Sequence, residues 1–423
     1  MRHPDFVTVH YMKALILSIG EELLTGQTVN TNAAWMARQL NLAAVEVEEI
    51  RVIHDKRDDI RRSLQEVDPA ISLVLITGGL GPTRDDVTRD VLCEHFDARL
   101  VPDQEVLNDI TTYFTQRGRE VTGINRDQAM VPDKARVLRN PNGTAPGMWF
   151  ELDGRSCIAM PGVPFEMKEM MRNLVMPALL EKQGDRHILH KTVLTQGVGE
   201  SALMEIIEGW EDNLPEDIQL AYLPSTGIVK LRLTGRGSHK SQLEEVINGQ
   251  IDRLKQIIPE YIWGYDDDTL EGVLGEKLRE RGLTLTTAES CTGGYLAHRI
   301  TSVAGSSDYF TGGIIAYDNR VKTGPLLGVD TRLIDSHGAV SREVAEAMAL
   351  GAREGMHTDL AVATTGIAGP GGGTTNKPVG TTWIAIASEK GVHSKHHAFG
   401  NNRGRNLILA ANAAMAMLIH SLK

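Results

Sequence analysis

The chain has 423 residues, of which 41% are hydrophobic and 23% are charged, proportions that are ordinary for a globular protein of several domains. Its formal net charge of −11 argues against broad binding to nucleic acids or membrane surfaces, and its early apolar run, residues 14–19, is far too short to span a bilayer. Three cysteines are too few for a disulfide framework and match no zinc-binding spacing, which favours a reducing cytoplasm.

The first third of the chain alternates predicted strands with predicted helices. Continuous apolar runs predict buried strands at residues 14–19 and 73–76, and a further strand is predicted near residues 45–52. Apolar residues at helical spacing around 34–40, and a charged segment at 55–66, predict the helices between them. Because this β-α-β-α-β order gives a parallel, doubly wound sheet, we expect ligands to bind beyond the carboxyl ends of its strands.

Two motifs lie at those strand ends, residues 20–32 and residues 77–88. The second is a glycine-rich turn that opens a helix predicted near Asp86, so its backbone N–H groups and the helix dipole can cradle a phosphate. It is neither a Walker A loop nor a GxGxxG fingerprint. Asp85 and Asp86 beside a phosphate suggest a divalent metal, and the alternative is that they cap the helix.

A third cluster of turn residues spans 140–147 and leads to residues 157–168. Repeated proline and glycine predict ordered loops on either side of a strand, followed by a helix from about Pro164. Glu166 falls in the first turn of that helix. It is either a ligand of a metal or a ribose, or a carboxylate that the helix dipole favours at this position.

Residues 185–260 predict a small α+β module. Strands are predicted at 190–195 and 228–234, and helices near 201–210 and at 241–258. The Gly235-Arg236-Gly237 turn has no basic surroundings, so we interpret the module as a spacer or a dimerisation element and not as an RNA-binding domain.

The last part of the chain begins with a helix predicted at residues 270–281 and a strand that starts near residue 283. This strand breaks at Ser290 and Cys291 into a turn, and a helix is predicted from about Thr292. Because a helix start has unpaired N–H groups and a positive dipole end, it can activate a serine or cysteine nucleophile and receive an oxyanion. The alternative is that Ser290 or a nearby threonine merely caps the helix.

The remaining elements form a second α/β domain. Strands are predicted at residues 309–317, 360–364 and 381–388, with a helix at 341–355 and an alanine-rich helix at the end. We expect three loops of this domain to converge: residues 289–294, 317–322 and 365–373.

A serine is a weak nucleophile until a base removes its proton. The domain has no recognisable Ser/His/Asp order, and we interpret five of its histidines as surface residues: His298, His337, His393, His396 and His397. Lys322 is the better candidate base, with Tyr317 five residues before it. Partial burial and a nearby Arg403 would lower the pKa of this lysine enough for it to accept a proton.

Cys291 is the rival nucleophile. A thiol is intrinsically more nucleophilic, but nothing in the sequence pairs Cys291 with a histidine, and a buried structural cysteine is the usual case. The glycine-rich loop 365–373 follows a predicted strand and offers a second phosphate cradle, to which Arg403 and Arg405 could contribute charge.

These motifs together resemble those of the competence/damage-inducible CinA family over nearly the whole chain. The second half resembles the family's nicotinamide-nucleotide amidase domain in residues 288–294, 316–322, 338–341, 365–370 and 377–380. The first half resembles the family's molybdopterin-binding-like domain in residues 20–32 and 77–86. We therefore expect an α/β fold with two three-layer α/β domains, residues 12–180 and 265–423, and a small α+β module, residues 185–260, between them.

The resemblance implies two hydrolytic activities in one pyridine-nucleotide salvage enzyme. The second domain would convert nicotinamide mononucleotide to nicotinate mononucleotide and ammonia without a cofactor. The first would cleave ADP-ribose to AMP and ribose 5-phosphate with a divalent ion, Mg²⁺, Mn²⁺ or Co²⁺. The expected protein is a cytoplasmic homodimer that binds neither nucleic acid nor membrane. The alternatives are a protein that binds pterins or nucleotides without catalysis, and an enzyme with the amidase activity alone.

The resemblance also implies roles for individual residues. Ser290 would be the nucleophile, Lys322 the general base and Tyr317 a helper in proton transfer. Thr365 and Gly366 would help to bind substrate or hold the oxyanion, and Arg403 would bind the phosphate. The other expected substrate-binding residues are Gly293 and Gly294 in the second half, and Asn30, Asn32, Gly78, Gly79, Gly81, Pro82, Thr83 and Thr144 in the first. A metal would be held by Asp86 and by Glu166. Asp86 fits the alignment with molybdopterin-binding sites better than Asp85 does.

The chain departs from the family pattern at two places. The family usually has Ser-Asn-Glu-Ala-Lys where this chain has Asp318-Asn-Arg320-Val-Lys322, so a positive charge is added near the base. The usual Gly-Asp-Arg near the end is replaced by residues 400–403, Gly-Asn-Asn-Arg, which makes Arg403 a weaker match.

Overall fold

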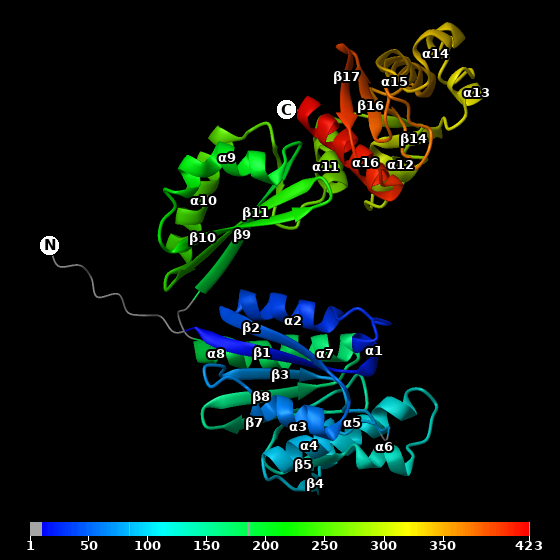
Figure 1. Cartoon of the computed structure of the whole chain (residues 1–423). Coiled ribbons are helices and arrows are strands. Elements are labelled where there is room, and N and C mark those ends of the chain that lie inside the picture. Colours follow the sequence, from blue (N-terminus) through cyan, green and yellow to red (C-terminus); the bar gives the residue numbers. More distant parts are fainter. Residues whose placement is uncertain (1–10, 84, 184–186, 423) are drawn as a thin grey trace, which may run out of the picture. The chain divides into compact units, whose positions relative to one another are not determined.

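The computed structural model describes residues 11–83, 85–183 and 187–422. These residues form two compact units, which can be followed in Figure 1. The first unit runs to Leu189 and includes residues 236–243, and the second comprises residues 190–235 and the chain from Glu244 onward. Arg84 of the predicted phosphate turn, and residue 185 at the predicted start of the middle module, lie outside the described residues.

The first unit is built on a six-stranded sheet with the order β2-β1-β3-β8-β7-β6. Its strands are β1 (Met12–Ile19), β2 (Val45–Ile53), β3 (Leu73–Thr77), β6 (Arg136–Leu138), β7 (Gly147–Leu152) and β8 (Arg155–Met160). The pairs β1–β2, β1–β3 and β3–β8 are parallel, as predicted for the first three strands. The pairs β7–β8 and β6–β7 are antiparallel, so the sheet is mixed and not wholly parallel.

The antiparallel edge has a local cause in the sequence. Strands β7 and β8 are joined by Asp153 and Gly154 alone, and both residues have positive φ angles, 51° and 78°. Asp-Gly is a preferred pair for the tight turn that matches the twist of a hairpin. The chain therefore reverses at this point without a crossover helix.

Helices cover both faces of this sheet and make a three-layer unit. They are α1 (Glu21–Leu24), α2 (Thr31–Leu42), α3 (Arg57–Gln65), α4 (Thr88–His95), α5 (Gln104–Thr115), α6 (Gly123–Asp127), α7 (Pro164–Met170) and α8 (Met176–Gln183), beside the short strands β4 (Leu100–Pro102) and β5 (Met130–Pro132). Successive residues of β1 point to opposite faces: Ile16 packs with α2 and α7, whereas Leu15 and Leu17 pack with α3 and α4.

The second unit starts with a four-stranded sheet of order β10-β11-β9-β12. The elements are β9 (His187–Gln196), α9 (Glu200–Glu211), β10 (Ile218–Ser225), β11 (Ile228–Gly237), α10 (Lys240–Ile257) and β12 (Ile262–Tyr265). This β-α-β-β-α-β order and strand arrangement are those of ferredoxin-like folds. Leu194 and Trp263 of this sheet belong to the same hydrophobic core as Leu274 and Leu285 of the following domain, so the module is packed and not a free spacer.

The rest of the second unit is a five-stranded sheet of order β14-β13-β15-β16-β17. Its elements are α11 (Leu270–Arg281), β13 (Leu285–Glu289), α12 (Tyr295–Thr301), β14 (Phe310–Ile315), α13 (Asn319–Lys322), α14 (Thr331–His337), α15 (Arg342–Met356), β15 (Leu360–Gly366), β16 (Thr381–Ser388), β17 (Gly391–Ala398) and α16 (Arg403–Ser421). Strand β13 is parallel to β14 and β15, whereas β16 and β17 are antiparallel.

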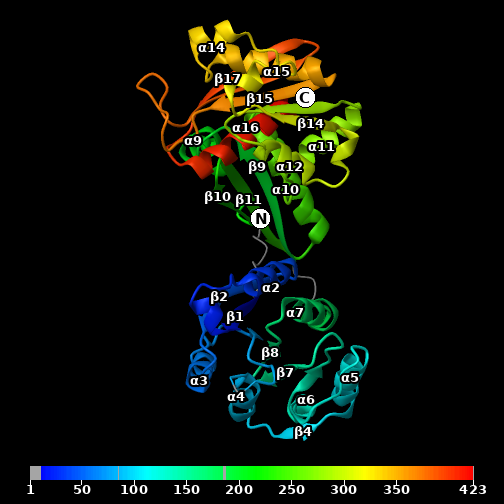
Figure 2. The same cartoon turned by 90° about the vertical axis from the view of Figure 1, so that its right-hand side faces the viewer.

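This sheet is also covered on both faces, as Figure 2 shows, with α15 on one side and α16 on the other. Val362 of β15 packs with α16, whereas its neighbours Ala361 and Ala363 pack with α15. The chain is therefore an α/β protein with layered sheets, as predicted. None of the described helices is long and apolar enough to cross a membrane.

Candidate active sites

The carboxyl ends of the three parallel strands of the second unit meet at Ser290. The N–H group of Ser290 donates to the carbonyl of Thr364 in β15, at 2.8 Å. On the other side, the N–H group of Ala316 donates to the carbonyl of Glu289, at 2.7 Å. Ser290 thus lies between the ends of β14 and β15, where ligands bind in α/β sheets.

The turn after Ser290 is longer than predicted. Helix α12 begins at Tyr295 and not near Thr292, because residues 291–294 form turns. Gly293 and Gly294 both have left-handed backbones, with φ angles of 61° and 97°. A side chain at either position would be strained, so the paired glycines are required by the shape of this elbow, residues 290–294.

The start of α12 is already occupied by a carboxylate that sequence reasoning missed. Glu289 is 1% exposed, and its side chain accepts hydrogen bonds from the N–H groups of Gly294 (3.0 Å), Leu296 (3.0 Å) and Ala297 (2.8 Å). The expectation that these N–H groups receive an oxyanion is therefore wrong. The N–H group of Gly293 has no hydrogen-bond partner among the described residues and remains available to a substrate oxygen.

Replacing Glu289 with glutamine should loosen the elbow. The amide can accept with one oxygen only, and its NH₂ group would face backbone donors, which leaves at least one buried N–H group unpaired. We expect a local loss of about 2 kcal/mol, read as a roughly thirtyfold faster hydrogen exchange of peptides covering residues 294–297. Glu354→Gln, on the exposed side of α15, is the matched control. Unchanged exchange in the Glu289 variant would contradict this role.

Lys322 is buried at the end of α13, beside the same strand ends. Lys322 is only 2% exposed, and its Nζ donates to the carbonyl of Ala316 at 2.8 Å. Burial lowers the pKa of Lys322 below its usual value, while the nearby Asp318 and Cys291 act in the opposite direction. The predicted influence of Arg403 on this pKa is wrong, because burial is the cause of the shift.

Asp318 and Arg320, the two residues of the 318–322 segment that bring charges foreign to the family pattern, form an ion pair with each other. The guanidinium of Arg320 donates from Nε to Asp318 Oδ1 at 3.0 Å, and the Arg320 side chain is 90% exposed. The added charge is thus directed to solvent and balanced by its neighbour. Arg320 is not among the groups that shift the pKa of Lys322.

Tyr317 lies with the predicted phosphate ligand. Tyr317 is 61% exposed, and its hydroxyl accepts a hydrogen bond from Arg403 Nη2 at 3.1 Å. Arg403 also donates from Nη1 to the carbonyl of Gly369, at 2.9 Å. Arg403 therefore connects the 317–322 loop to the 365–373 loop, at the first residue of α16.

The two other predicted residues of the 365–373 loop have structural partners. The Thr365 hydroxyl donates to the carbonyl of Ala339 at 2.8 Å. A methyl group on Gly366 would lie 3.1 Å from Cys291 Sγ and 2.6 Å from Thr382 Oγ1, so only glycine fits there. Burial raises the pKa of the Cys291 thiol to about 12, which leaves it protonated and weakly nucleophilic at neutral pH.

One histidine differs from its interpretation as a surface residue. His397 of β17 is half-buried, and burial together with the charge of Lys395 and with His396 lowers its pKa to about 4. It is therefore neutral at physiological pH. His393 and His396 of the same strand are exposed, as predicted.

In the first unit, Asn30 and Asn32 line a cavity of about 130 Å³ at the carboxyl ends of β1 and β3. Asn30 caps α2 by accepting from the N–H group of Ala33, and its Nδ2 donates to Ser18 Oγ at 3.0 Å. Asn32 Nδ2 donates to the carbonyl of Gly162 at 2.7 Å. Asn32 Oδ1 is buried without a protein partner, so it can accept a hydrogen bond from a ligand.

The glycines of the 77–88 motif allow close packing. A methyl group on Gly78 would lie 2.2 Å from the carbonyl oxygen of Ile19, and one on Gly79 would lie 2.1 Å from Thr88 Oγ1. Helix α4 starts at Thr88 and not near Asp86. The turn therefore brings its backbone against the end of β1, next to the cavity lined by Asn30 and Asn32.

Asp86 folds back on its own turn. Its Oδ2 accepts from the N–H group of Thr83 at 2.9 Å and also from the Thr83 hydroxyl. A methyl group on Gly81 would lie 2.6 Å from the same oxygen, and Pro82 is exposed beside it. One oxygen of Asp86 is thus engaged within the turn, and the other has no partner among the described residues.

Glu166 is held by Asn140, a second residue that sequence reasoning missed. Glu166 is 8% exposed, and burial raises the pKa of its carboxyl even though the hydrogen bond from Asn140 Nδ2, at 2.6 Å, opposes the shift. A methyl group on Gly143 would lie 2.1 Å from Glu166 Oε2, and Thr144 is half-buried beside that glycine.

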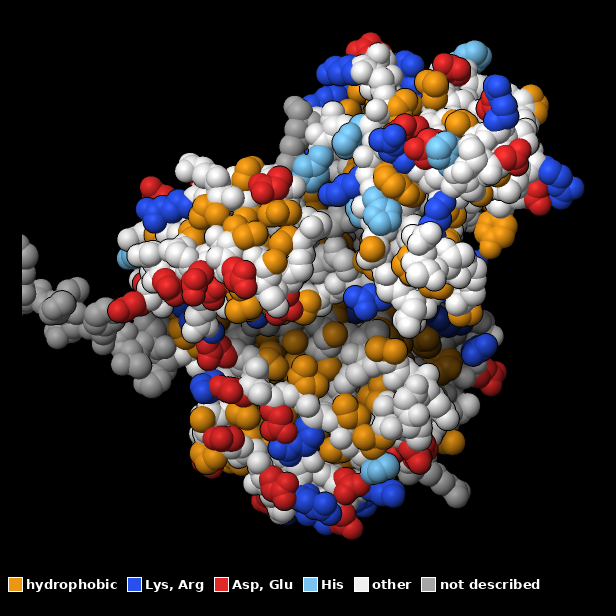
Figure 3. Space-filling model, turned by 45° about the horizontal axis from the view of Figure 1, so that its top comes forward, with side chains coloured by type: hydrophobic (Ala, Val, Ile, Leu, Met, Phe, Trp, Pro, Cys, Tyr) orange, Lys and Arg blue, Asp and Glu red, His pale blue; other side chains and the backbone are white. Residues whose placement is uncertain are grey.

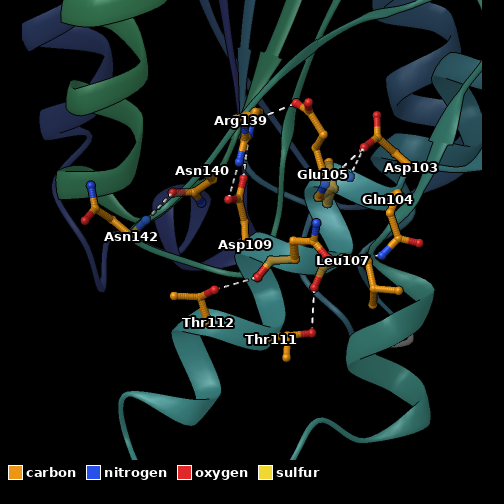
Figure 4. A network of polar contacts seen from close by, with 12 residues as sticks. Asp103, Gln104, Glu105, Leu107, Asp109, Thr111, Thr112, Arg139, Asn140 and Asn142 are labelled. Carbon is orange, nitrogen blue, oxygen red and sulfur yellow. Dashed lines mark hydrogen bonds and ion pairs between the residues drawn. The ribbon is translucent and has the colours of Figure 1, made fainter.

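Figure 4 shows how Asn140 is positioned. The preceding residue, Arg139, donates from Nε to Asp109 Oδ2 at 2.8 Å and from Nη1 to Glu105 Oε2 at 3.1 Å, both on α5. Asn140 Oδ1 accepts from the N–H group of Asn142 at 3.2 Å. These contacts fix the loop that carries Asn140 and thereby the Glu166 carboxylate.

The described residues contain no group of three or more His, Cys, Asp or Glu side chains that could hold a metal. Asp86 and Glu166 offer oxygen atoms only. Such a pair suits a hard cation like Mg²⁺, which keeps several waters and takes further oxygens from substrate phosphates. The donor type of these two residues therefore suits a cation that arrives with a phosphorylated substrate, and the described residues form no closed structural metal site.

Three family models match the chain and together span most of it. Residues 15–181 match a probable molybdopterin binding domain, residues 190–264 the damage-inducible protein CinA KH domain, and residues 267–422 the CinA C-terminal domain. The chain is 46% identical to a CinA-like protein of Flavobacterium psychrophilum over 96% of this chain and 98% of that protein. It is 42% identical to a CinA-like protein of Cytophaga hutchinsonii over 98% of this chain and 99% of that protein.

A solved structure is also similar to part of the chain. The competence/damage inducible protein CihA of Agrobacterium tumefaciens is 39% identical where it matches, which covers 36% of this chain and 92% of that one, with a TM-score of 0.35.

Proposed function

The chain belongs to the CinA family, and we propose that it is a bifunctional pyridine-nucleotide salvage enzyme with two hydrolytic activities. Its second unit would hydrolyse the amide of nicotinamide mononucleotide, and its first unit would hydrolyse the pyrophosphate of ADP-ribose. The observation that carries the amidase is the buried Lys322, whose pKa burial lowers, beside the strand end that presents Ser290. A buried lysine with no carboxylate partner is costly for folding and is typical of functional sites.

The amidase would proceed through an acyl-enzyme. Ser290 Oγ attacks the carboxamide carbon while neutral Lys322 takes the hydroxyl proton, and the N–H group of Gly293 donates to the developing oxyanion. The proton then passes from Lys322 to the amide nitrogen, the C–N bond breaks, and ammonia leaves. Lys322 next removes a proton from water, which hydrolyses the ester and releases nicotinate mononucleotide. Arg403 would bind the substrate phosphate, and Tyr317, whose hydroxyl accepts from Arg403, would help in proton transfer.

In the first unit, the cavity lined by Asn30 and Asn32 would receive part of ADP-ribose. The backbone of the 77–88 turn would lie along the pyrophosphate. Asp86 and Glu166 would hold a divalent cation, which when bound would offset the charge on the pyrophosphate. Asn140 would keep the Glu166 carboxylate in place.

The proposal includes no nucleic-acid role for the middle module, although its family model is named for the KH domain. KH domains clamp nucleotides with a GxxG loop, and residues 190–264 have no two glycines three positions apart. This segment has eleven Asp and Glu residues against seven Lys and Arg residues. Figure 3 shows acidic side chains gathered over the module, where phosphates would be repelled.

The proposal is tested by incubating the purified protein with nicotinamide mononucleotide and with ADP-ribose, with and without a chelator, followed by chromatography. We expect ammonia release in both conditions and cleavage of ADP-ribose only without chelator. Binding of both nucleotides without any product would favour the alternative, a non-catalytic pterin- or nucleotide-binding protein. Ammonia release alone would leave the enzyme with the amidase activity only.

One variant separates the two activities in the same assay. Gly143→Ala places a methyl group against Glu166 Oε2, so it should displace this carboxylate and lower ADP-ribose cleavage by about tenfold or more, while ammonia release stays unchanged. Gly123→Ala is the matched control, since a methyl group there would have no heavy atom within 4 Å. Full ADP-ribose cleavage by the Gly143 variant would contradict the role of Glu166.

A further inference from the structure

A second cavity lies at the opposite end of the sheet that carries Ser290. Its volume is about 460 Å³, within the range of small-molecule sites. It is lined near the amino ends of β13 and β15 by Leu283 and Leu360, and by residues of the turn between β16 and β17. The predicted catalytic groups lie at the carboxyl ends of β13 and β15, so neither proposed activity uses this cavity.

Three cations line this cavity: Arg281, Arg353 and Lys390. The described residues place no carboxylate within ion-pair distance of any of them, although the chain as a whole has a net charge of −11. The lining also contains two carboxylates, Asp359 and Glu389, so the cations outnumber the acids by one. The Asp359 carboxylate accepts from the N–H group of Thr284 at 2.8 Å and from the Thr284 hydroxyl at 2.7 Å. These bonds are the largest cause of the lowered pKa of the Asp359 carboxyl, to which the charge of Arg353 adds a smaller contribution.

Arg353 is oriented for an anion. Its Nε donates to the backbone carbonyl of Asp359 at 3.0 Å, which fixes the guanidinium plane. Its two terminal nitrogens have no hydrogen-bond partner among the described residues. A guanidinium anchored on one edge presents a pair of N–H groups that match two oxygens of a phosphate.

Much of the remaining wall is aliphatic, although Ser388, His393 and Ser421 also line the cavity. Leu283, Leu360, Ile386, Val392 and Leu422 contribute to the cavity wall. Such a wall gains nothing from a bare inorganic ion, but it favours an apolar or planar body attached to the anion. The combination of cations on one part and aliphatic side chains on another is the pattern of a site for an amphipathic anion.

We propose that this cavity binds an organic phosphate of mononucleotide size, with the phosphate on Arg353, Lys390 and Arg281 and the organic body on the aliphatic wall. A phosphate monoester carries close to two negative charges at neutral pH, which suits three cations better than a single carboxylate would. This site goes beyond the proposed function, because it lies away from both sets of predicted catalytic residues.

The test uses the full chain and AMP as the probe, and it reads occupancy at one side chain. Lys390 is acetylated with acetic anhydride, and the modification is quantified by peptide mass spectrometry at increasing AMP. We expect AMP to slow acetylation of Lys390 by about fivefold or more, and to leave Lys277 on α11 unaffected. Because the reading is local, AMP bound in the first unit does not contribute, and neither proposed activity needs to exist.

Variants and related probes decide which contacts matter. Arg353→Gln should raise the AMP concentration for half-protection by about tenfold, whereas Arg342→Gln, on the same helix but paired with Glu343, should not change it. Adenosine and inorganic phosphate should each protect Lys390 less than AMP does. The proposal is overturned if millimolar AMP leaves Lys390 unprotected, or if either half of the molecule protects as well as the whole.

Discussion

Replacing Ser290 with alanine is expected to lower the rate of ammonia release from nicotinamide mononucleotide by about a thousandfold or more. The variant lacks the oxygen that attacks the carboxamide carbon and forms the acyl-enzyme in the proposed mechanism. Because Ser290 sits between β14 and β15 through its backbone, the substitution should leave the elbow in place. The measurement is initial-rate ammonia release at saturating substrate, with substrate binding measured separately to show that the pocket is intact.

Cys291 supplies the matched control. Its thiol is buried and its pKa is raised to about 12, so Cys291→Ala should retain most of the amidase rate. The variant leaves a small void beside Gly366, which is expected to affect stability more than chemistry. A variant pair in which Ser290→Ala stays active and Cys291→Ala is inactive would reverse the assignment of the nucleophile.

The buried strands and the position of the elbow could be read from the sequence because they depend on local signals. Continuous apolar runs mark strands β1 and β3, and paired glycines mark the turn after Ser290. Strand β17, residues 391–398, could not be predicted. It lies at the edge of its sheet and most of its side chains are exposed, so its histidines and lysine give no apolar alternation.

The contacts that hold the candidate sites could not be predicted, because they join residues far apart in sequence. Asn140 reaches Glu166 across 26 positions, and Thr365 is held by Ala339 across 26 positions. The carboxylate of Glu289 is a different case. The N–H groups that donate to this carboxylate belong to residues only five to eight positions further along the chain. An acid that ends a buried strand before a glycine turn was therefore a usable signal in the sequence.

The structure also changes how the base is understood. Partial burial and a nearby Arg403 were both expected to lower the pKa of Lys322, but burial alone lowers it, and Arg320 is paired with Asp318 at the surface. Burial lowers the pKa of Lys322 only while the strand ends exclude water from its side chain. The tuning of the base therefore depends on the fold of the second unit more than on any single neighbouring charge.

Lys322→Met is expected to lower the amidase rate by about a hundredfold to ten-thousandfold, the usual range for loss of a general base. Methionine is unbranched and apolar, so it can occupy the buried channel of the lysine side chain. Lys277→Met, on the outer part of α11, is the matched control and should leave the rate unchanged. A Lys322 variant with wild-type activity would remove this residue from the mechanism.

The pH dependence of the wild-type enzyme gives an independent reading of the same base. The neutral amine is the active form, so the rate should rise with pH through the pKa of Lys322 and then level off. Because burial lowers that pKa, the rate should be half-maximal at a pH below 10.5, the ordinary pKa of lysine. The same rise should be absent from whatever activity remains in Lys322→Met. A half-maximal rate at or above pH 10.5 would contradict the assignment of Lys322 as a base whose pKa is lowered by burial.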